Sequence, residues 1–400
     1  MFMSSKRYLL TILILGTLTA LVPFSIDMYL PGFKAIAKAL DTTVTDVALT
    51  LSSFFIGVSV AQLLYGPLLD RFGRKRPLYA GLVIYILSSV ACVLAGSLDS
   101  LIALRFVQAL GACAASVAAN AMVRDLFPVE DNAKVFSALM LVLSTSPLIA
   151  PTAGGYLIAA WGWHSVFLVL AAIALLIIFA VWLFLTESSK PDPNYSLKPK
   201  AILGNYWAVL RNRQFFTYSI SGAIAFSGLF AYISCSPSIF MELYKVSEET
   251  YGWIFALLAS GVIGGTQANR IALKYFSSAQ VVRGAMIMQT FFGVIMFLAT
   301  YYGLIGLTGM LVMLFLFLTC VGFILPNSSA LCMQPFTRNA GSASAMMGAL
   351  QMGIGSLSAF SVSLFDNSTP LPMTGIMAGL AIVATFILLT RSRKVQTAVA

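Results

Sequence analysis

The sequence predicts an all-α, polytopic membrane protein with twelve transmembrane helices in two six-helix halves. Three observations predict this class. Of the 400 residues, 59% are hydrophobic and only 10% are charged, whereas soluble domains carry roughly 25% charged residues. Apolar runs of about 20 residues, the length that crosses the hydrocarbon of a bilayer, recur along the chain. Basic residues gather in alternate connecting segments, which is typical of a multi-pass protein.

The apolar runs divide the chain into twelve predicted spans. The connections between them are short except for residues 187–214, a polar segment that contains Pro191, Pro193 and Pro199. This segment divides the spans six and six, so we expect an N-terminal half over 1–186, a cytoplasmic linker over 187–214 and a C-terminal half over 215–400. The predicted spans are 8–30, 47–67, 77–97, 100–123, 134–160, 164–186, 215–240, 250–272, 280–300, 304–327, 339–363 and 372–390.

The placement of Lys and Arg predicts how the chain is oriented in the membrane. With a cytoplasmic N-terminus, 20 of the 24 basic residues fall on inner segments. Only Lys34, Lys38 and Lys245 fall on outer segments, and Arg105 lies inside the fourth span. Because cytoplasmic loops carry the excess of positive charge, both termini are expected on the cytoplasmic side.

Several other classes of protein are disfavoured. There is no GxxxxGK[ST] run and no Gly-Lys dipeptide, so an ATP-hydrolysing domain is not expected. The five cysteines lie far apart without a CxxC pair, and the chain has one His, so neither a metal site nor a disulfide framework is predicted. The net charge of +10 would suggest a nucleic-acid partner in a soluble protein, but here it follows from the loop charges and we expect none.

The two halves resemble each other weakly after their second spans. The spacing of four residues in the first half recurs in the second half. An internal repeat of this kind is typical of transporters built from two halves. The matching sets are Gly66, Asp70, Arg71 and Lys75 in the first half, and Gly265, Asn269, Arg270 and Lys274 in the second.

Two charged residues inside predicted spans, Asp27 and Arg105, are candidates for function. A carboxylate in a span costs roughly 2.5–3.5 kcal/mol on insertion scales, so Asp27 on the first span predicts a carboxyl that binds a proton and a substrate in turn. The alternative is that Asp27 only marks the outer end of the span. Arg105 on the fourth span is expected at a similar depth, where a permanent cation would bias the protonation of a partner such as Asp27. The alternative is a static ion pair that only holds the two spans together.

Weakly polar residues recur at helical spacing on several spans and predict a central cavity. Aromatic and Met side chains beside them suit flat, apolar ligands. The alternative is that small and polar residues only pack helices together in lipid. The candidate cavity-lining residues are Phe24, Phe55, Gln62, Gln108, Ser116, Tyr232, Met347 and Gln351.

Four motifs resemble signatures of one family. The run from Gly66 to Leu78 resembles G-x-L-x-D-R-x-G-R-K-x-x-L of the major facilitator superfamily. Arg105 and Gln108 resemble its R-x-x-Q-G signature, with Ala109 in place of Gly. Residues 150–155 are similar to the antiporter signature G-P-x-x-G-G, with Ala150 in place of the first Gly. Residues 25–31 are similar to drug/proton antiporters of the Bcr/CflA type.

The resemblance implies the major facilitator fold, with two six-helix halves around a cavity. It also implies proton-driven export of small drugs such as bicyclomycin or chloramphenicol-like phenicols, by a protein of the bacterial inner membrane that works as a monomer without a cofactor other than the coupling proton. Finally, it implies a cytoplasmic gate that closes against the inner end of the eleventh span. The gate residues would be Gly66, Asp70, Arg71, Gly73, Arg74 and Asp125.

The fifth span has its own expected features. Pro147 and Pro151 each remove a backbone donor, so they should kink this helix. Gly154 and Gly155 allow a facing helix to approach closely.

Two other functions remain as alternatives. One is a proton-coupled transporter of a natural metabolite such as an amino acid, a peptide or a sugar. Sugars need many hydrogen-bonding groups, so a single membrane carboxylate and apolar stripes favour amphipathic drugs. The other is a membrane enzyme or receptor, which would need a cluster of catalytic side chains at the membrane surface. We find no such cluster, and we do not expect an enzyme.

Overall fold

The computed structural model describes residues 5–127, 129–192, 196–336, 340–365 and 369–396, and these residues form helices joined by short connections, with no strand among them. Of the basic residues behind the predicted orientation, Arg338 lies outside the described residues. The side chains of Lys6, Arg7, Lys134, Arg393 and Lys394 lie outside them too.

The described residues contain twelve long helices that form the bundle, and each overlaps one predicted span with ends that differ by a few residues. Ten of them are long and apolar enough to cross a membrane, and α7 and α11 complete the set. The predicted fold class is thereby confirmed. The first six are α1 (Ser5–Asp27), α4 (Leu49–Phe72), α5 (Lys75–Val93), α6 (Leu98–Leu126), α7 (Val129–Trp161) and α8 (His164–Phe184). The second six are α10 (Arg213–Pro237), α11 (Glu248–Ala272), α12 (Ser278–Tyr301), α13 (Leu307–Met333), α14 (Ala340–Ser363) and α15 (Leu371–Gln396).

The short elements lie between the long ones. Leu30–Gly32 (η1), Phe33–Ala39 (α2) and Val44–Val47 (α3) connect α1 to α4, and Ser238–Leu243 (η2) is a π-helical turn that extends α10. Polar residues in the connections begin many of the helices. Ser97 caps α6 in a reciprocal capping box with Ser100, and Ser247 caps α11. Such caps satisfy amide groups that a helix start leaves without partners.

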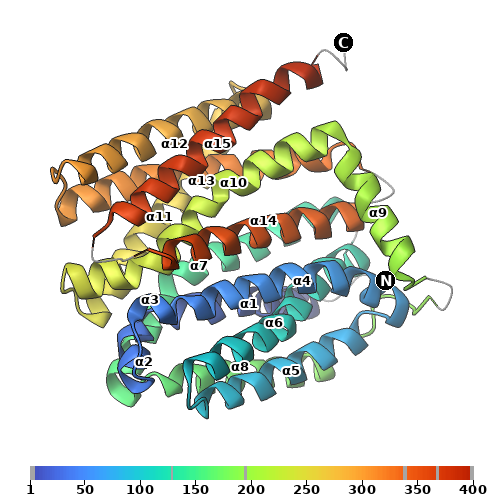
Figure 1. The fold of residues 1–400 in the computed structure, drawn as a ribbon. Coiled ribbons are helices and arrows are strands. Elements are labelled where there is room, and N and C mark those ends of the chain that lie inside the picture. Colours follow the sequence, from blue (N-terminus) through green and yellow to red (C-terminus); the bar gives the residue numbers. More distant parts are fainter. Residues whose placement is uncertain (1–4, 128, 193–195, 337–339, 366–368, 397–400) are drawn as a thin grey trace.

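The long helices run side by side, with the N-terminal half on one side of the bundle and the C-terminal half on the other (Figure 1). The start of α1, the end of α15 and the linker helix α9 (Pro199–Arg211) lie at one end, called here the α9 end. The short helices α2 and α3 lie at the opposite end, called the α3 end. The halves meet where α4 packs against α14 and where α7 packs against α11.

The contact of α4 with α14 closes the middle of the bundle. The Ser59 hydroxyl donates to the Ala349 carbonyl at 2.8 Å, and the Ser356 hydroxyl donates to the Ser52 carbonyl at 3.2 Å. Phe55 of α4 meets Phe230 of α10 edge to face, with ring centroids 4.5 Å apart. These contacts fill the space between the halves at mid-depth.

Main chains approach closely at the α3 end, which is closed. Gly154 of α7 lies against the main chain of Met28, and a Cβ added to Gly154 would stand 2.8 Å from the Met28 carbonyl carbon. A Cβ on Gly252 of α11 would stand 2.9 Å from the Thr152 Cα. Glycine at these positions therefore allows α7 to fit between the end of α1 and the start of α11.

The linker contains a helix that the sequence analysis did not predict. Pro199 stands in the first turn of α9, where proline is favoured because its fixed φ suits a helix start. The Tyr206 hydroxyl donates to the Leu63 carbonyl of α4 at 2.8 Å. The helix has 13 residues, too few to cross a membrane, so a reading based on apolar length passes over it.

Candidate functional site

A cavity of about 180 Å³ lies at the α9 end, between α4, α6, α9 and α14. Asp70 stands at its rim with a side chain 47% exposed, so the cavity communicates with the surface at this end. Two of the candidate cavity-lining residues, Gln62 and Ser116, do line it. Other lining residues include Gly66, Asn120, Arg124, Tyr206, Ser342 and Ser344.

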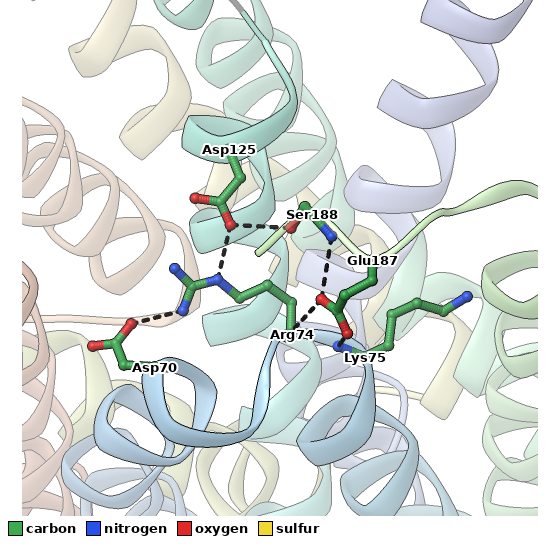
Figure 2. Close-up of polar contacts among 6 residues, drawn as sticks. All are labelled: Asp70, Arg74, Lys75, Asp125, Glu187 and Ser188. Atoms are coloured by element: carbon green, nitrogen blue, oxygen red, sulfur yellow. Dashed lines mark hydrogen bonds and ion pairs between the residues drawn. The ribbon is translucent and has the colours of Figure 1, made fainter. Parts of the chain in front are cut away.

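Three of the predicted gate residues, Asp70, Arg74 and Asp125, form a network at the rim of this cavity (Figure 2). The Arg74 Nη1 donates to Asp70 Oδ1 at 2.7 Å, and its Nε donates to Asp125 Oδ2 at 2.8 Å. Burial lowers the pKa of the Arg74 guanidinium, but the bonds to Asp125 and Asp70 outweigh burial and hold the pKa above its ordinary value. Arg74 is thus a permanent cation that joins the end of α4 to the end of α6. Both this network and the first turn of α14 line the cavity.

The start of the linker binds the same loop, a contact that the sequence analysis missed. The Glu187 carboxylate accepts from the main-chain amides of Arg74 at 2.8 Å and Lys75 at 3.1 Å (Figure 2). A carboxylate at a helix start is favourable, because unpaired amides and the helix dipole attract it. Gly73 has φ +82°, and a Cβ there would lie 3.1 Å from Glu187 Oε2. Glycine therefore serves both the turn and the close approach of Glu187.

Further contacts hold the linker segment 185–192, called here the linker strap. The Ser188 hydroxyl donates to Asp125 Oδ2 at 3.0 Å (Figure 2). The Lys75 Nζ donates to the Leu185 carbonyl at 2.7 Å, and the Arg71 Nη1 donates to the Asp192 carbonyl at 3.3 Å. The only sequence signal for the strap was an acidic residue directly after the sixth span, in a linker where five of the seven charged residues are basic.

Asp27 lies far from this network, at the closed α3 end. It is the last residue of α1 and is 4% exposed. Its carboxyl interacts electrostatically with Tyr232 of α10 and Tyr251 of α11. The Tyr251 hydroxyl lies 2.8 Å from the Ser236 hydroxyl, so these polar groups from the C-terminal half face a carboxyl from the N-terminal half. Tyr232 was a candidate cavity residue, whereas Tyr251 and Ser236 were not foreseen in this role.

Arg105 lies on another side of α1, inside the N-terminal half. It is fully buried, and its Nη2 donates to the Ser25 carbonyl at 2.9 Å. Its Nη1 donates to Gln108 Oε1, and its guanidinium lies over the rings of Tyr29 and Phe54 at 4.7 and 4.3 Å. Contacts of this type stabilise a desolvated cation.

The structure shows no direct ion pair between Arg105 and Asp27, and both residues are described. Asp27 follows two residues after Ser25, and at 3.6 residues per turn two residues carry a side chain to nearly the opposite face of a helix. Gln108 likewise belongs to the interior of the N-terminal half, where its Nε2 donates to the Ser89 hydroxyl at 2.7 Å.

The remaining candidate residues lie at three other places. Phe55 of α4 contacts Phe230, and the pair lies between the cavity and Asp27 along the bundle. On α4, Gln62 on one side of Phe55 lines the cavity. Thr50 on the other side bonds Tyr29, which is close to Asp27 in the sequence. The Met347 sulfur of α14 lies 3.3 Å from the Cys332 sulfur. Phe24 on α1 and Gln351 on α14 are partly buried. Pro147 and Pro151 lie inside α7.

Two packed six-helix halves, a polar network at one end and a buried carboxyl between the halves are typical of a membrane transporter. The Major Facilitator Superfamily matches residues 15–360. The chain belongs to this family.

Curated relatives match along nearly the whole chain. An uncharacterized MFS-type transporter of Bacillus subtilis, YdgK, is 30% identical and covers 98% of both chains. A bicyclomycin resistance protein homolog of Haemophilus influenzae is 29% identical over 97% of this chain and 98% of its own. Multidrug resistance protein D of Escherichia coli is 28% identical over 90% and 91%. Among solved structures, a D-xylose-proton symporter matches with a TM-score of 0.74 at 16% identity, over 96% of this chain and 98% of that one, which supports the fold.

Proposed function

We propose that this transporter is a proton-coupled antiporter that exports small amphipathic drugs by alternating access. Bicyclomycin and phenicols are the proposed substrate classes. Relatives named for bicyclomycin resistance and multidrug resistance support this direction. The chain itself supports it through one buried carboxyl between the halves and a cavity of mixed polar and apolar lining.

Asp27 is the observation that carries the proposal. A carboxyl that is 4% exposed and in no ion pair with a described residue is a group that gains and loses a proton as its surroundings change. When the halves separate at the α3 end, Asp27 meets the outer solution and takes up a proton. When that end closes and the α9 end opens, the proton leaves toward the cytoplasm.

The drug enters on the opposite side of the aromatic contact. Asp27 is not among the residues that line the cavity, so a drug held there does not touch the carboxyl in this conformation. Coupling is therefore indirect: the proton and the drug occupy different sites, and the same rocking of the halves, which separates Phe55 from Phe230, changes the side to which both sites are open. A neutral drug can be exported by this scheme because no charge on the drug is required.

The charge pattern supports an orientation with the α9 end in the cytoplasm. The described basic residues Arg71, Arg74, Lys75 and Arg76 lie at that end, with the linker strap, and cytoplasmic loops carry such charge. We place the protein in the bacterial inner membrane with both termini in the cytoplasm, acting as a monomer with the proton as its only cofactor. The cavity then faces the cytoplasm, from which a drug would enter.

The test is transport by purified protein in proteoliposomes that hold a pH gradient and no ATP. One charge moved along 100 mV supplies about 2.3 kcal/mol, enough for roughly a 50-fold gradient of a neutral drug. Bicyclomycin should accumulate on the acidic side, and a protonophore should abolish the accumulation. Uptake that requires ATP and ignores the pH gradient contradicts the proposal. Resistance profiling of cells that express the chain, with and without the protonophore, defines the range of drugs.

A further inference from the structure

The linker helix α9 has an apolar face that the bundle covers only in part. It runs across the α9 end, at a steep angle to the long helices (Figure 1). One side of α9 packs on the protein through Tyr206 and Val209, which are buried, and through Ile202 and Leu210, which are half-buried. These four residues lie on one stripe of a helix with about 3.6 residues per turn.

Two large apolar side chains extend this face beyond the protein. Leu203 is 64% exposed and Trp207 is 58% exposed. At helical spacing Leu203 and Trp207 lie on one line, directly beside Leu210 at the edge of the covered stripe. The apolar face is therefore one continuous surface that is wider than the part of the bundle that covers it.

Basic residues stand on the border of the uncovered part. Lys200 and Arg211 are both exposed. At helical spacing they lie directly beside the line of Leu203 and Trp207, on the side away from Leu210. The Arg211 guanidinium lies over the Trp207 ring, 5.3 Å from its centroid. No Asp or Glu occurs between Asp192 and Glu242, so the positive charge of this surface is not offset within its own segment.

The neighbouring surface of α4 is apolar as well. The Tyr206 hydroxyl bonds the carbonyl of Leu63, and the adjacent Leu64 is exposed. Val60 and Ile56, one and two turns away on α4, are also exposed. A stripe of this kind on a membrane-spanning helix faces lipid, so α9 crosses the bundle at the point where a lipid-facing stripe ends.

We propose that α9 lies in the headgroup region of the bilayer, with Leu203 and Trp207 inserted and with Lys200 and Arg211 bound to anionic lipid headgroups. An interfacial helix combines an apolar face that carries Trp and Leu with cations on its border, and an anionic membrane surface attracts such cations. Because Tyr206 lines the cavity, anionic lipid would hold one wall of the cavity in place. Lipid binding at this surface requires neither a particular transported substrate nor proton coupling.

The experiment uses a polarity-sensitive fluorophore attached to a single introduced cysteine in the full-length protein. Leu203→Cys reports on the uncovered apolar line. Asn205→Cys is the matched control, because Asn205 is exposed on the same helix but lies on the other flank. The five native cysteines are buried, and the unsubstituted protein labelled in parallel gives the background.

Both labelled variants are reconstituted in vesicles of zwitterionic phospholipid alone, or of the same lipid mixed with an anionic phospholipid, each with a fraction of brominated chains. The label at 203 should be blue-shifted and quenched several-fold more strongly than the label at 205, and more so with anionic lipid. The double substitution Lys200→Gln and Arg211→Gln should remove the gain from anionic lipid.

Three results overturn the proposal. Equal, weak quenching at 203 and 205 places the apolar line in water. Quenching at 203 that does not depend on anionic lipid removes the headgroup assignment. Cross-linking between the 203 positions of two copies at low protein density, with no quenching by lipid, shows instead that a second copy of the chain covers this face.

Discussion

Asp27 holds the only carboxyl among the described residues that lies buried between the two halves, beside Tyr232 and Tyr251 of the opposite half. We predict that Asp27→Asn abolishes proton-driven export while expression stays normal, because an amide has the same shape but cannot titrate. Drug-induced proton release from the purified protein is the direct measurement. Asp99→Asn, on an exposed acid in the first turn of α6, is the matched control and should release protons as the unsubstituted protein does. Normal proton release from Asp27→Asn would place the coupling acid elsewhere.

Arg105 belongs to the interior of the N-terminal half, and we expect its main role to be structural. Arg105→Gln removes the bond to the Ser25 carbonyl and the contacts with Tyr29 and Phe54, a loss of about 2 kcal/mol. Thermal unfolding should therefore occur at lower temperature. The pH midpoint of drug-induced proton release should match that of the unsubstituted protein, since no ion pair joins Arg105 to Asp27. A shifted midpoint with unchanged thermal stability would restore Arg105 as the residue that tunes the carboxyl.

At this scale the sequence identified which residues are unusual, but not what they face. A charged residue inside an apolar span is visible in the sequence, which is why Asp27 and Arg105 were both singled out. Their partners come from tertiary packing. Ser25 and Asp27 point to nearly opposite sides of α1, and only the placement of α6 and α11 around α1 decides which side meets Arg105 and which meets Tyr251.

The linker strap shows how a segment outside the spans fixes the start of a helix. Glu187→Gln keeps the shape of the side chain but removes the charge that attracts the first amides of α5. That charge is worth about 0.3–1 kcal/mol, so turnover should fall by about two- to fivefold. Drug affinity should be unchanged, because Glu187 is not among the cavity-lining residues.

Turnover is measured by transport in vesicles and drug affinity by binding in detergent, so the two predicted outcomes can be checked separately. Lys190→Gln is the control, as it changes an exposed charge in the same segment and should leave turnover unaltered. Loss of drug affinity in Glu187→Gln, with normal folding, would contradict the role given to the strap.

The elements that apolar length predicts were found, and those that depend on docking were not. Each long helix overlaps its predicted span, because a run of about 20 apolar residues has the length and composition of a membrane-spanning helix. Helix α9 and the linker strap have no such signal, since both are stabilised by contacts with α4, α5 and α6. The weak internal repeat did correspond to structure: Asn269, which matches Asp70, accepts from Asn327 Nδ2 of α13 at 2.6 Å, as Asp70 belongs to a network that reaches α6.

On the scale of the whole molecule, the two ends of the bundle differ in how the halves meet. At the α9 end a cavity lies between α4, α6, α9 and α14. At the α3 end glycines bring main chains together, and Lys34 of the N-terminal half attracts Glu248 of the C-terminal half. In the proposed alternating-access cycle, the contacts at the α3 end must break when the cavity at the α9 end closes. We therefore expect the close contacts at these glycines to affect the population of each state, and a single methyl group added there is a sensitive probe.

We predict that Gly154→Ala shifts the population toward a state that is open at the α3 end. The added Cβ would lie 2.8 Å from the Met28 carbonyl carbon, which is main chain and cannot rotate away, so α7 must move from the end of α1. Gly284→Ala is the control, because no atom lies within 4 Å of a Cβ at that position. Spin labels at Lys34→Cys and Glu249→Cys, which lie on opposite halves and line one surface pocket, report the separation. In Gly154→Ala the distance distribution should lengthen and drug export should fall, whereas Gly284→Ala should match the unsubstituted protein in both. An unchanged distribution together with full export would show that the contact between α7 and Met28 does not limit opening, and that the two halves separate about a different line.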